Sequence, residues 1–90
     1  MKNFTNKVAV ITGAGSGMGR YLSVLLAKAG ANVAICEINP TTLAETEAML
    51  KDYSVKVTSH IIDVADKAAI DVLPAQVIEL HGHVDMVFNN

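Results

Sequence analysis

Four of the chain's six glycines fall within seven residues, from Gly13 to Gly19. The preceding run, residues 7–12, is short, apolar and β-branched, which is typical of a strand buried on both faces. After the glycines, apolar residues recur every three or four positions up to Gly30, which predicts an amphipathic helix. At such a strand-to-helix turn, free backbone N–H groups can meet a phosphate that a Cβ atom would keep away. The predicted inward-facing residues of this helix are Met18, Tyr21, Leu22, Leu25, Leu26 and Ala29.

The rest of the chain continues to alternate between strand and helix patterns. Further strands are expected over residues 32–36, 56–62 and 84–88. One helix is expected to begin with Asn39 as its N-cap and Pro40 in its first turn, and another to cover residues 66–81. This β-α-β-α-β-α-β order predicts an α/β fold with a parallel sheet, cut after its fourth strand. In the last helix, Pro74 predicts a kink or a division into two shorter helices. The residues expected to face inward there are Ile70, Leu73, Val77 and Leu80.

Composition narrows the classes of function. The chain has 90 residues, 51% of them hydrophobic, which suits one packed domain at most. A net charge of −2 provides no basic surface, so we expect no nucleic-acid partner. No apolar run approaches the roughly 20 residues of a membrane span, so we expect no membrane association. Cys36 is the only cysteine, which excludes an intramolecular disulfide and favours a cytoplasmic location.

The glycine segment has a specific spacing. It does not fit G-x-G-x-x-G, because Met18 stands sixth when the count begins at Gly13. It does fit Thr-Gly-x-x-x-Gly-x-Gly, beginning at Thr12. This pattern resembles the cofactor loop of the short-chain dehydrogenases/reductases, and the resemblance implies a Rossmann-type sheet that binds NAD. It further implies that Gly15 tolerates other small residues. The loop residues that it places against the cofactor are Gly13, Ser16, Gly17, Met18 and Gly19.

An acidic residue follows the second predicted strand. Glu37 stands 20 residues after Gly17, where a carboxylate can accept hydrogen bonds from both ribose hydroxyls of adenosine. The same carboxylate would repel a 2′-phosphate. By resemblance to the family, this position selects NAD, because the neighbouring positions Ile38 and Ser16 carry no basic side chain.

Two further strand ends carry polar residues. The resemblance places Asp63 against the adenine amino group and the backbone N–H of Val64 against a ring nitrogen; alternatively, Asp63 begins the third helix. Asn89 and Asn90 resemble the start of the family's Asn-Asn-Ala-Gly segment, whose amides can tie neighbouring strand ends together near the cofactor.

The family's catalytic residues are not found in these 90 residues. They include a serine and a Tyr-x-x-x-Lys motif, but Leu25 follows Tyr21 at that spacing and Val57 follows Tyr53. The resemblance therefore implies a partial NAD-binding domain over residues 1–90. The whole enzyme would transfer a hydride between nicotinamide and an alcohol or carbonyl substrate, and could be a homo-oligomer. Whether this chain is itself an enzyme is left open.

Two alternatives remain beside this interpretation. One is a fragment of an S-adenosylmethionine-dependent methyltransferase, which also has a glycine loop and acids after its strands. The other is a non-catalytic nucleotide-binding module. Of the remaining polar residues, Arg20 is expected to lie on the solvated face of its helix. His81 and His83 are expected to be cap and surface residues, with no metal site, and Cys36 to pack in the sheet.

Overall fold

The computed structural model describes residues 3–90, so the first two residues of the expected domain range 1–90 lie outside the described residues. The order of strands and helices is the predicted one. The elements are β1 (Val8–Ile11), α1 (Gly17–Lys28), β2 (Asn32–Glu37), α2 (Pro40–Leu50), β3 (Val57–Ile61), α3 (Lys67–His81) and β4 (Met86–Phe88).

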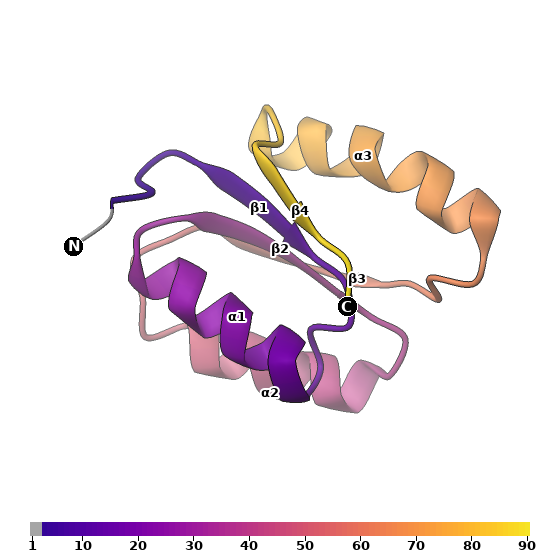
Figure 1. The fold of residues 1–90 in the computed structure, drawn as a ribbon, viewed down its shortest axis with the longest axis horizontal. Helices are drawn as coiled ribbons and strands as arrows, with labels where there is room; N and C mark the ends of the chain where they lie inside the picture. Colours follow the sequence, from indigo (N-terminus) through magenta and orange to yellow (C-terminus); the bar gives the residue numbers. More distant parts are fainter. Residues whose placement is uncertain (1–2) are drawn as a thin grey trace.

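The four strands form one parallel sheet in the order β3-β2-β1-β4. Helices α1 and α2 cover one face of this sheet and α3 covers the other (Figure 1). This three-layer arrangement confirms the predicted Rossmann-type α/β fold. Because all strands run in the same direction, their carboxyl ends meet at one edge, where the loops predicted to bind cofactor begin.

The sheet separates two hydrophobic cores, as expected for a parallel sheet with helices on both faces. Along β1, Ala9 and Ile11 pack toward α1 and α2, whereas Val8 and Val10 pack toward α3. Cys36 is fully buried in the core under α3, where burial raises the pKa of its thiol to about 12. Across residues 3–90, the structure contains no helix with the length and hydropathy needed to span a membrane.

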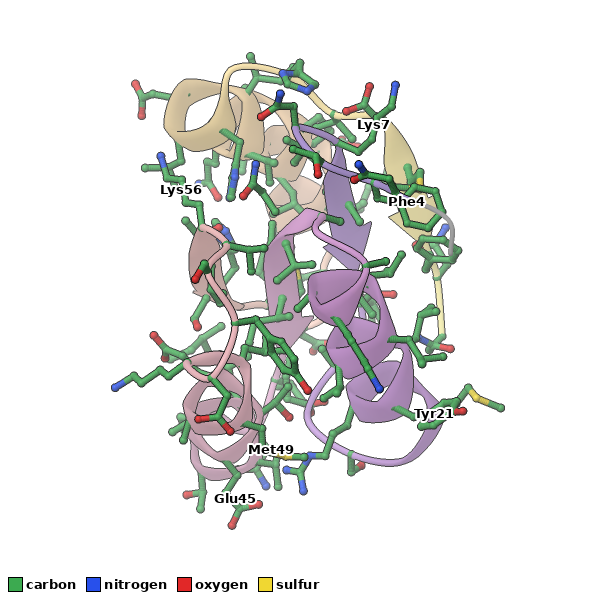
Figure 2. All side chains as sticks on the ribbon, turned by 90° about the vertical axis from the view of Figure 1, so that its left-hand side faces the viewer. Phe4, Lys7, Tyr21, Glu45, Met49 and Lys56 are labelled. Carbon is green, nitrogen blue, oxygen red and sulfur yellow. The ribbon has the colours of Figure 1, made fainter. Side chains whose placement is uncertain are left out.

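Helix α1 buries a different face from the predicted one. Three of the residues predicted to face inward are exposed, Met18 at 69%, Tyr21 at 61% and Leu25 at 44%, and Tyr21 projects from the side of α1 away from α2 (Figure 2). The buried residues of α1 are Gly19, Ser23, Leu26 and Ala27, of which Leu26 was predicted to face inward. The predicted stripe was therefore wrong in part, because small side chains on the inner face let the helix lie close to its neighbours.

Helix α3 also differs from the expectation. It is one helix across Pro74, so the expected division into two helices does not occur. Leu73 and Val77 are buried as predicted, but Leu80 is 43% exposed. Pro74 itself lies on an exposed part of the helix surface. Gly82 ends α3 in the left-handed conformation, with φ of 93°.

The C-terminal end of α3 contacts β3 in a cluster of Thr58, His60 and His81, in which His81 makes the contact between the two elements. The hydroxyl of Thr58 lies 2.9 Å from His60 Nε2 and 2.8 Å from His81 Nε2. Burial lowers the pKa of both imidazoles, and the positive charge of Lys56 lowers that of His81 further. The hydrogen bond between His81 and Thr58 thus links α3 to the sheet, a role beyond the cap role expected from the sequence.

This histidine pair predicts a loss of stability in mild acid. Both folded-state pKa values lie below the ordinary value of 6.5. As the pH falls, the unfolded chain therefore binds more protons than the folded chain. The free energy of unfolding should therefore decrease as the pH drops below about 6.5. Urea unfolding between pH 7.5 and 5 measures this slope. A double variant, His60→Gln with His81→Gln, should show a flatter profile, and an equal slope in both proteins would contradict this account.

Candidate functional site

The carboxyl ends of β1 and β4 are tied together at the start of the glycine segment. The side-chain amide of Asn90 donates to the Thr12 carbonyl at 3.0 Å, and the Asn90 backbone N–H donates to the Thr12 hydroxyl at 3.1 Å. This confirms the expected tie between strand ends. Gly13 follows with φ of 64°, and a Cβ built on it would stand 3.2 Å from the Asn90 Cβ. A side chain at Gly13 would therefore be strained and would press on Asn90.

Helix α1 begins within the glycine segment, at Gly17, without a side-chain cap. Ser16 is the N-cap residue of α1, and its hydroxyl accepts no cap hydrogen bond. By contrast, Asn39 caps α2 by accepting from the backbone N–H groups of Thr41 and Thr42. The first N–H groups of a helix have no partner within the helix, so those of α1 are free to bind an anion.

Three further residues of the predicted cofactor loop lie at this helix start. Gly19 is buried, and a Cβ on it would stand 2.1 Å from the Gly13 carbonyl oxygen. Gly17 has φ of 56° and is exposed, and Met18 beside it is exposed as well. Gly19 therefore allows the backbone of α1 to approach the turn closely, and the exposed residues leave the first turn open to solvent.

Glu37, at the end of β2, lies against the glycine segment. Its carboxylate accepts from the Gly15 backbone N–H at 3.0 Å and from the Asn39 backbone N–H at 3.2 Å. A Cβ on Gly15 would stand 2.6 Å from Glu37 Cγ and 2.4 Å from Thr42 Oγ1. An alanine at Gly15 would therefore require the side chains of Glu37 and Thr42 to shift, and the expectation that Gly15 tolerates small side chains stays a prediction.

Asp63 and Val64 follow β3 and are exposed. Asp66, not Asp63, is the N-cap of α3, which excludes the alternative helix-start role for Asp63. The Asp63 carboxylate accepts from the Ala65 backbone N–H at 2.9 Å, and this hydrogen bond stabilises the turn between β3 and α3. The preceding Ile62 N–H donates to the Glu37 carbonyl at 3.1 Å, so these two strand ends are neighbours. Contact with adenine stays a prediction.

Arg20 is the site residue that sequence reasoning missed. The expected solvated position was wrong: its side chain is only 27% exposed and turns back onto the loop and α2. It donates to the carbonyl of Gly15, to Thr46 and to Glu45. Its α2 partners lie more than twenty residues away in sequence, so no local pattern shows them. The only available signal was its place directly after the last glycine of the motif.

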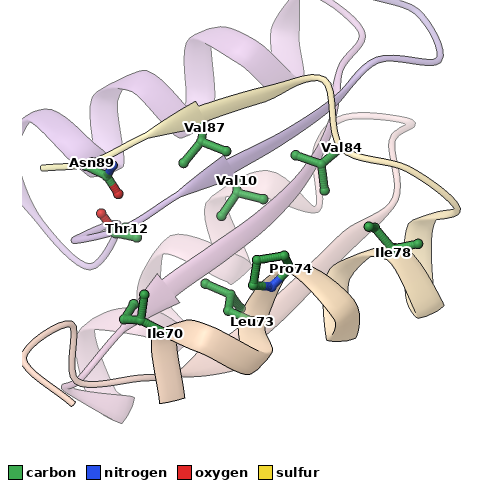
Figure 3. Close-up of a pocket in the computed structure, with 9 residues that line it drawn as sticks. All are labelled: Val10, Thr12, Ile70, Leu73, Pro74, Ile78, Val84, Val87 and Asn89. Carbon is green, nitrogen blue, oxygen red and sulfur yellow. The ribbon is translucent and has the colours of Figure 1, made fainter. Parts of the chain in front are cut away.

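An apolar groove of about 250 Å³ lies on the opposite face of the sheet, between α3 and the strands β1 and β4 (Figure 3). Thr12 and Asn89 stand at one end of it, so the groove approaches the strand ends from the α3 side. Asn89 therefore faces this groove, whereas Asn90 binds Thr12. Over the described residues 3–90, no group of three or more His, Cys, Asp or Glu residues is placed to hold a metal ion.

Comparison with known proteins decides the family. The family model described as short chain dehydrogenase matches residues 7–90. The chain belongs to the short-chain dehydrogenase family. The match includes all four strands and not the glycine loop alone. It therefore decides against the methyltransferase alternative, which rested on the glycine loop and the acids after the strands. The expected resemblance is therefore confirmed along nearly the full chain.

Individual members of the short-chain dehydrogenase family agree in sequence and fold. An uncharacterized oxidoreductase of Thermotoga maritima is 38% identical over 84 residues, which are 93% of this chain and 33% of the relative. NAD+-bound xylitol dehydrogenase has a TM-score of 0.94 and 31% identity, covering 99% of this chain and 34% of its own. A metagenomic short-chain oxidoreductase in complex with NADP has a TM-score of 0.85, at 28% identity, covering 92% of this chain and 38% of its own. The chain thus spans about a third of the relatives that it matches.

Proposed function

We propose that residues 1–90 form the NAD-binding portion of a short-chain oxidoreductase, holding the adenosine and pyrophosphate groups of the cofactor. The observation that carries this proposal is the uncapped start of α1 at Gly17, within the family's glycine loop. A pyrophosphate there would meet free N–H groups and the positive end of the helix dipole. The residues that would surround it are Gly13, Ser16, Gly17, Met18 and Gly19.

The choice of NAD over NADP rests on Glu37. Each of its carboxylate oxygens accepts one backbone N–H, and a carboxylate offers about four lone-pair sites. Acceptor capacity therefore remains for the two ribose hydroxyls, while the negative charge disfavours a 2′-phosphate. One similar structure contains NAD and another contains NADP, so the family alone leaves this choice open. Asp63 and Val64 would meet the adenine, and Asn89 and Asn90 would meet the cofactor from β4.

The reaction belongs to the whole protein. NAD supplies the hydride chemistry, and the chain's own residues bind and orient the cofactor. We propose an alcohol or carbonyl as the substrate of the complete enzyme, with the serine and Tyr-x-x-x-Lys residues supplied by sequence beyond these 90 residues. None of the described residues is given a catalytic role. Homo-oligomer formation and a cytoplasmic location stay predictions, as does the alternative of a non-catalytic nucleotide-binding module.

Calorimetric titration with NAD, NADP and S-adenosylmethionine tests the proposal. The protein expressed from its complete gene should bind NAD at least about tenfold more tightly than NADP, because one lost charged hydrogen bond is worth about that factor. S-adenosylmethionine should show no saturable binding. If the protein bound S-adenosylmethionine but not NAD, the cofactor assignment would be wrong. If it bound NADP as tightly as NAD, only the role given to Glu37 would be wrong.

A further inference from the structure

Arg20 connects the glycine segment to α2 through four hydrogen bonds. Its Nη2 atom donates to the Gly15 carbonyl at 2.5 Å, to the Thr42 carbonyl at 3.2 Å and to Glu45 Oε1 at 3.0 Å. Its Nε atom donates to the Thr46 hydroxyl at 2.9 Å. The Nε and Nη2 groups of the guanidinium are therefore directed at protein acceptors on α2 and the loop.

Thr46 extends this connection to the preceding residue of the loop. It is fully buried on α2, and its hydroxyl donates to the Ala14 carbonyl at 2.8 Å while accepting from Arg20. Two consecutive loop carbonyls, those of Ala14 and Gly15, are thus held by side chains. A buried threonine on a helix face costs stability unless its hydroxyl is bonded, and here both hydrogen-bonding roles are used.

These bonds also set the direction of the loop N–H groups. The structure has no cis peptide bond in the described residues, so each carbonyl points opposite to the N–H of the next residue. Holding the Ala14 carbonyl toward Thr46 directs the Gly15 N–H to Glu37, as observed. Holding the Gly15 carbonyl toward Arg20 directs the Ser16 N–H away from the guanidinium.

We propose that Arg20 and Thr46 form a loop clamp, a pair of positioning residues that hold the Gly15 N–H on Glu37 and turn the Ser16 N–H toward a bound pyrophosphate, without touching the cofactor. The inference rests on the proposed NAD site for its function, and on the hydrogen bonds alone for its structural part. The loop clamp aligns the loop peptides before binding, so the cofactor does not have to order them.

Conservative variants of Thr46 test the loop clamp in the protein expressed from its complete gene. Thr46→Val keeps the side-chain shape but removes the hydroxyl, and should weaken NAD and ADP-ribose binding about tenfold, the worth of one to two hydrogen bonds. Thr46→Ser keeps the hydroxyl and should stay within about twofold of wild type. Adenosine, which contacts Glu37 but lacks the pyrophosphate, should lose less affinity than NAD in Thr46→Val. Equal weakening by valine and serine, or equal loss for adenosine and NAD, would overturn the loop clamp.

A double-mutant cycle of Arg20 and Thr46, measured by NAD affinity, tests the role of Arg20. Arg20→Ala should weaken NAD binding about as much as Thr46→Val, and the double variant should be little weaker than either, because the two residues act as one unit. Glu45→Gln is the matched control, since it removes only the exposed ion pair and should leave affinity unchanged. Strictly additive losses would contradict the clamp.

Amide hydrogen exchange separates the loop clamp from the cofactor assignment. In protein without ligand, the N–H groups of residues 15–17 should exchange about tenfold faster in Thr46→Val than in Thr46→Ser. If wild type binds no dinucleotide but this difference appears, the proposed function fails and the structural part of the clamp holds. If the exchange rates are equal, the clamp fails whatever the protein binds.

Discussion

Replacing Glu37 by alanine should weaken NAD binding by about 10- to 100-fold, because hydrogen bonds to a charged group contribute about 1.5–3 kcal/mol. The same change should weaken NADP binding much less, since it also removes the negative charge that repels the 2′-phosphate. The preference for NAD should therefore largely disappear. Calorimetric titration of each variant with both cofactors measures the ratio directly.

Glu37→Gln is the matched control for this prediction, because Glu37 also supports the loop through the Gly15 N–H. Glutamine keeps one acceptor oxygen for that N–H but carries no charge. It should preserve most of the loop structure while reducing the discrimination between NAD and NADP. If the glutamine variant kept the full wild-type preference, charge repulsion would not be the basis of selection.

Replacing Gly19 by alanine should abolish detectable NAD binding, a loss of about 100-fold or more, and should destabilise the fold by about 1–3 kcal/mol. The added Cβ would meet the Gly13 carbonyl oxygen at 2.1 Å and the Gly13 carbonyl carbon at 2.7 Å. Both are backbone atoms, so the turn itself must move. Gly19 has no positive φ, and the expected effect is therefore steric, not conformational strain.

Gly82→Ala separates the effect on binding from the effect on stability. Gly82 has φ of 93° and open space around its Cβ position, so alanine there costs about 1–2 kcal/mol of backbone strain without contacting the loop. This variant should lose stability and retain NAD affinity. Urea unfolding and NAD titration of both variants make the comparison. Normal NAD binding by Gly19→Ala would show that the turn is not the pyrophosphate site.

The order of elements could be predicted because its signals are local. The β-branched run before Gly13, the Asn39-Pro40 helix start and the helix end at Gly82 each act within a few residues. Glu37 could be located for the same reason, since it directly follows a predicted strand. Its hydrogen bond to Gly15 could not be predicted, because 22 residues of chain separate the two partners.

The errors concern interactions set by packing between distant elements. Met18 and Tyr21 were assigned inward because they are large and apolar, yet they are exposed and the small residues Gly19 and Ser23 are buried. A hydropathy pattern gives most weight to large apolar residues. It therefore misses a helix face whose small residues allow close packing against neighbouring elements. Arg20 was placed in solvent by its charge, although its acceptors are backbone carbonyls and a buried hydroxyl.

The central claim is that the turn from Gly13 to Gly19 holds a pyrophosphate and that Glu37 holds the adenosine ribose. A crystal structure of the protein with NAD tests it most directly. The account predicts pyrophosphate oxygens within hydrogen-bond distance of N–H groups in the first turn of α1, with both ribose hydroxyls on the Glu37 carboxylate. A cofactor seated in the apolar groove between α3 and β4, or a ribose without contact to Glu37, would contradict it.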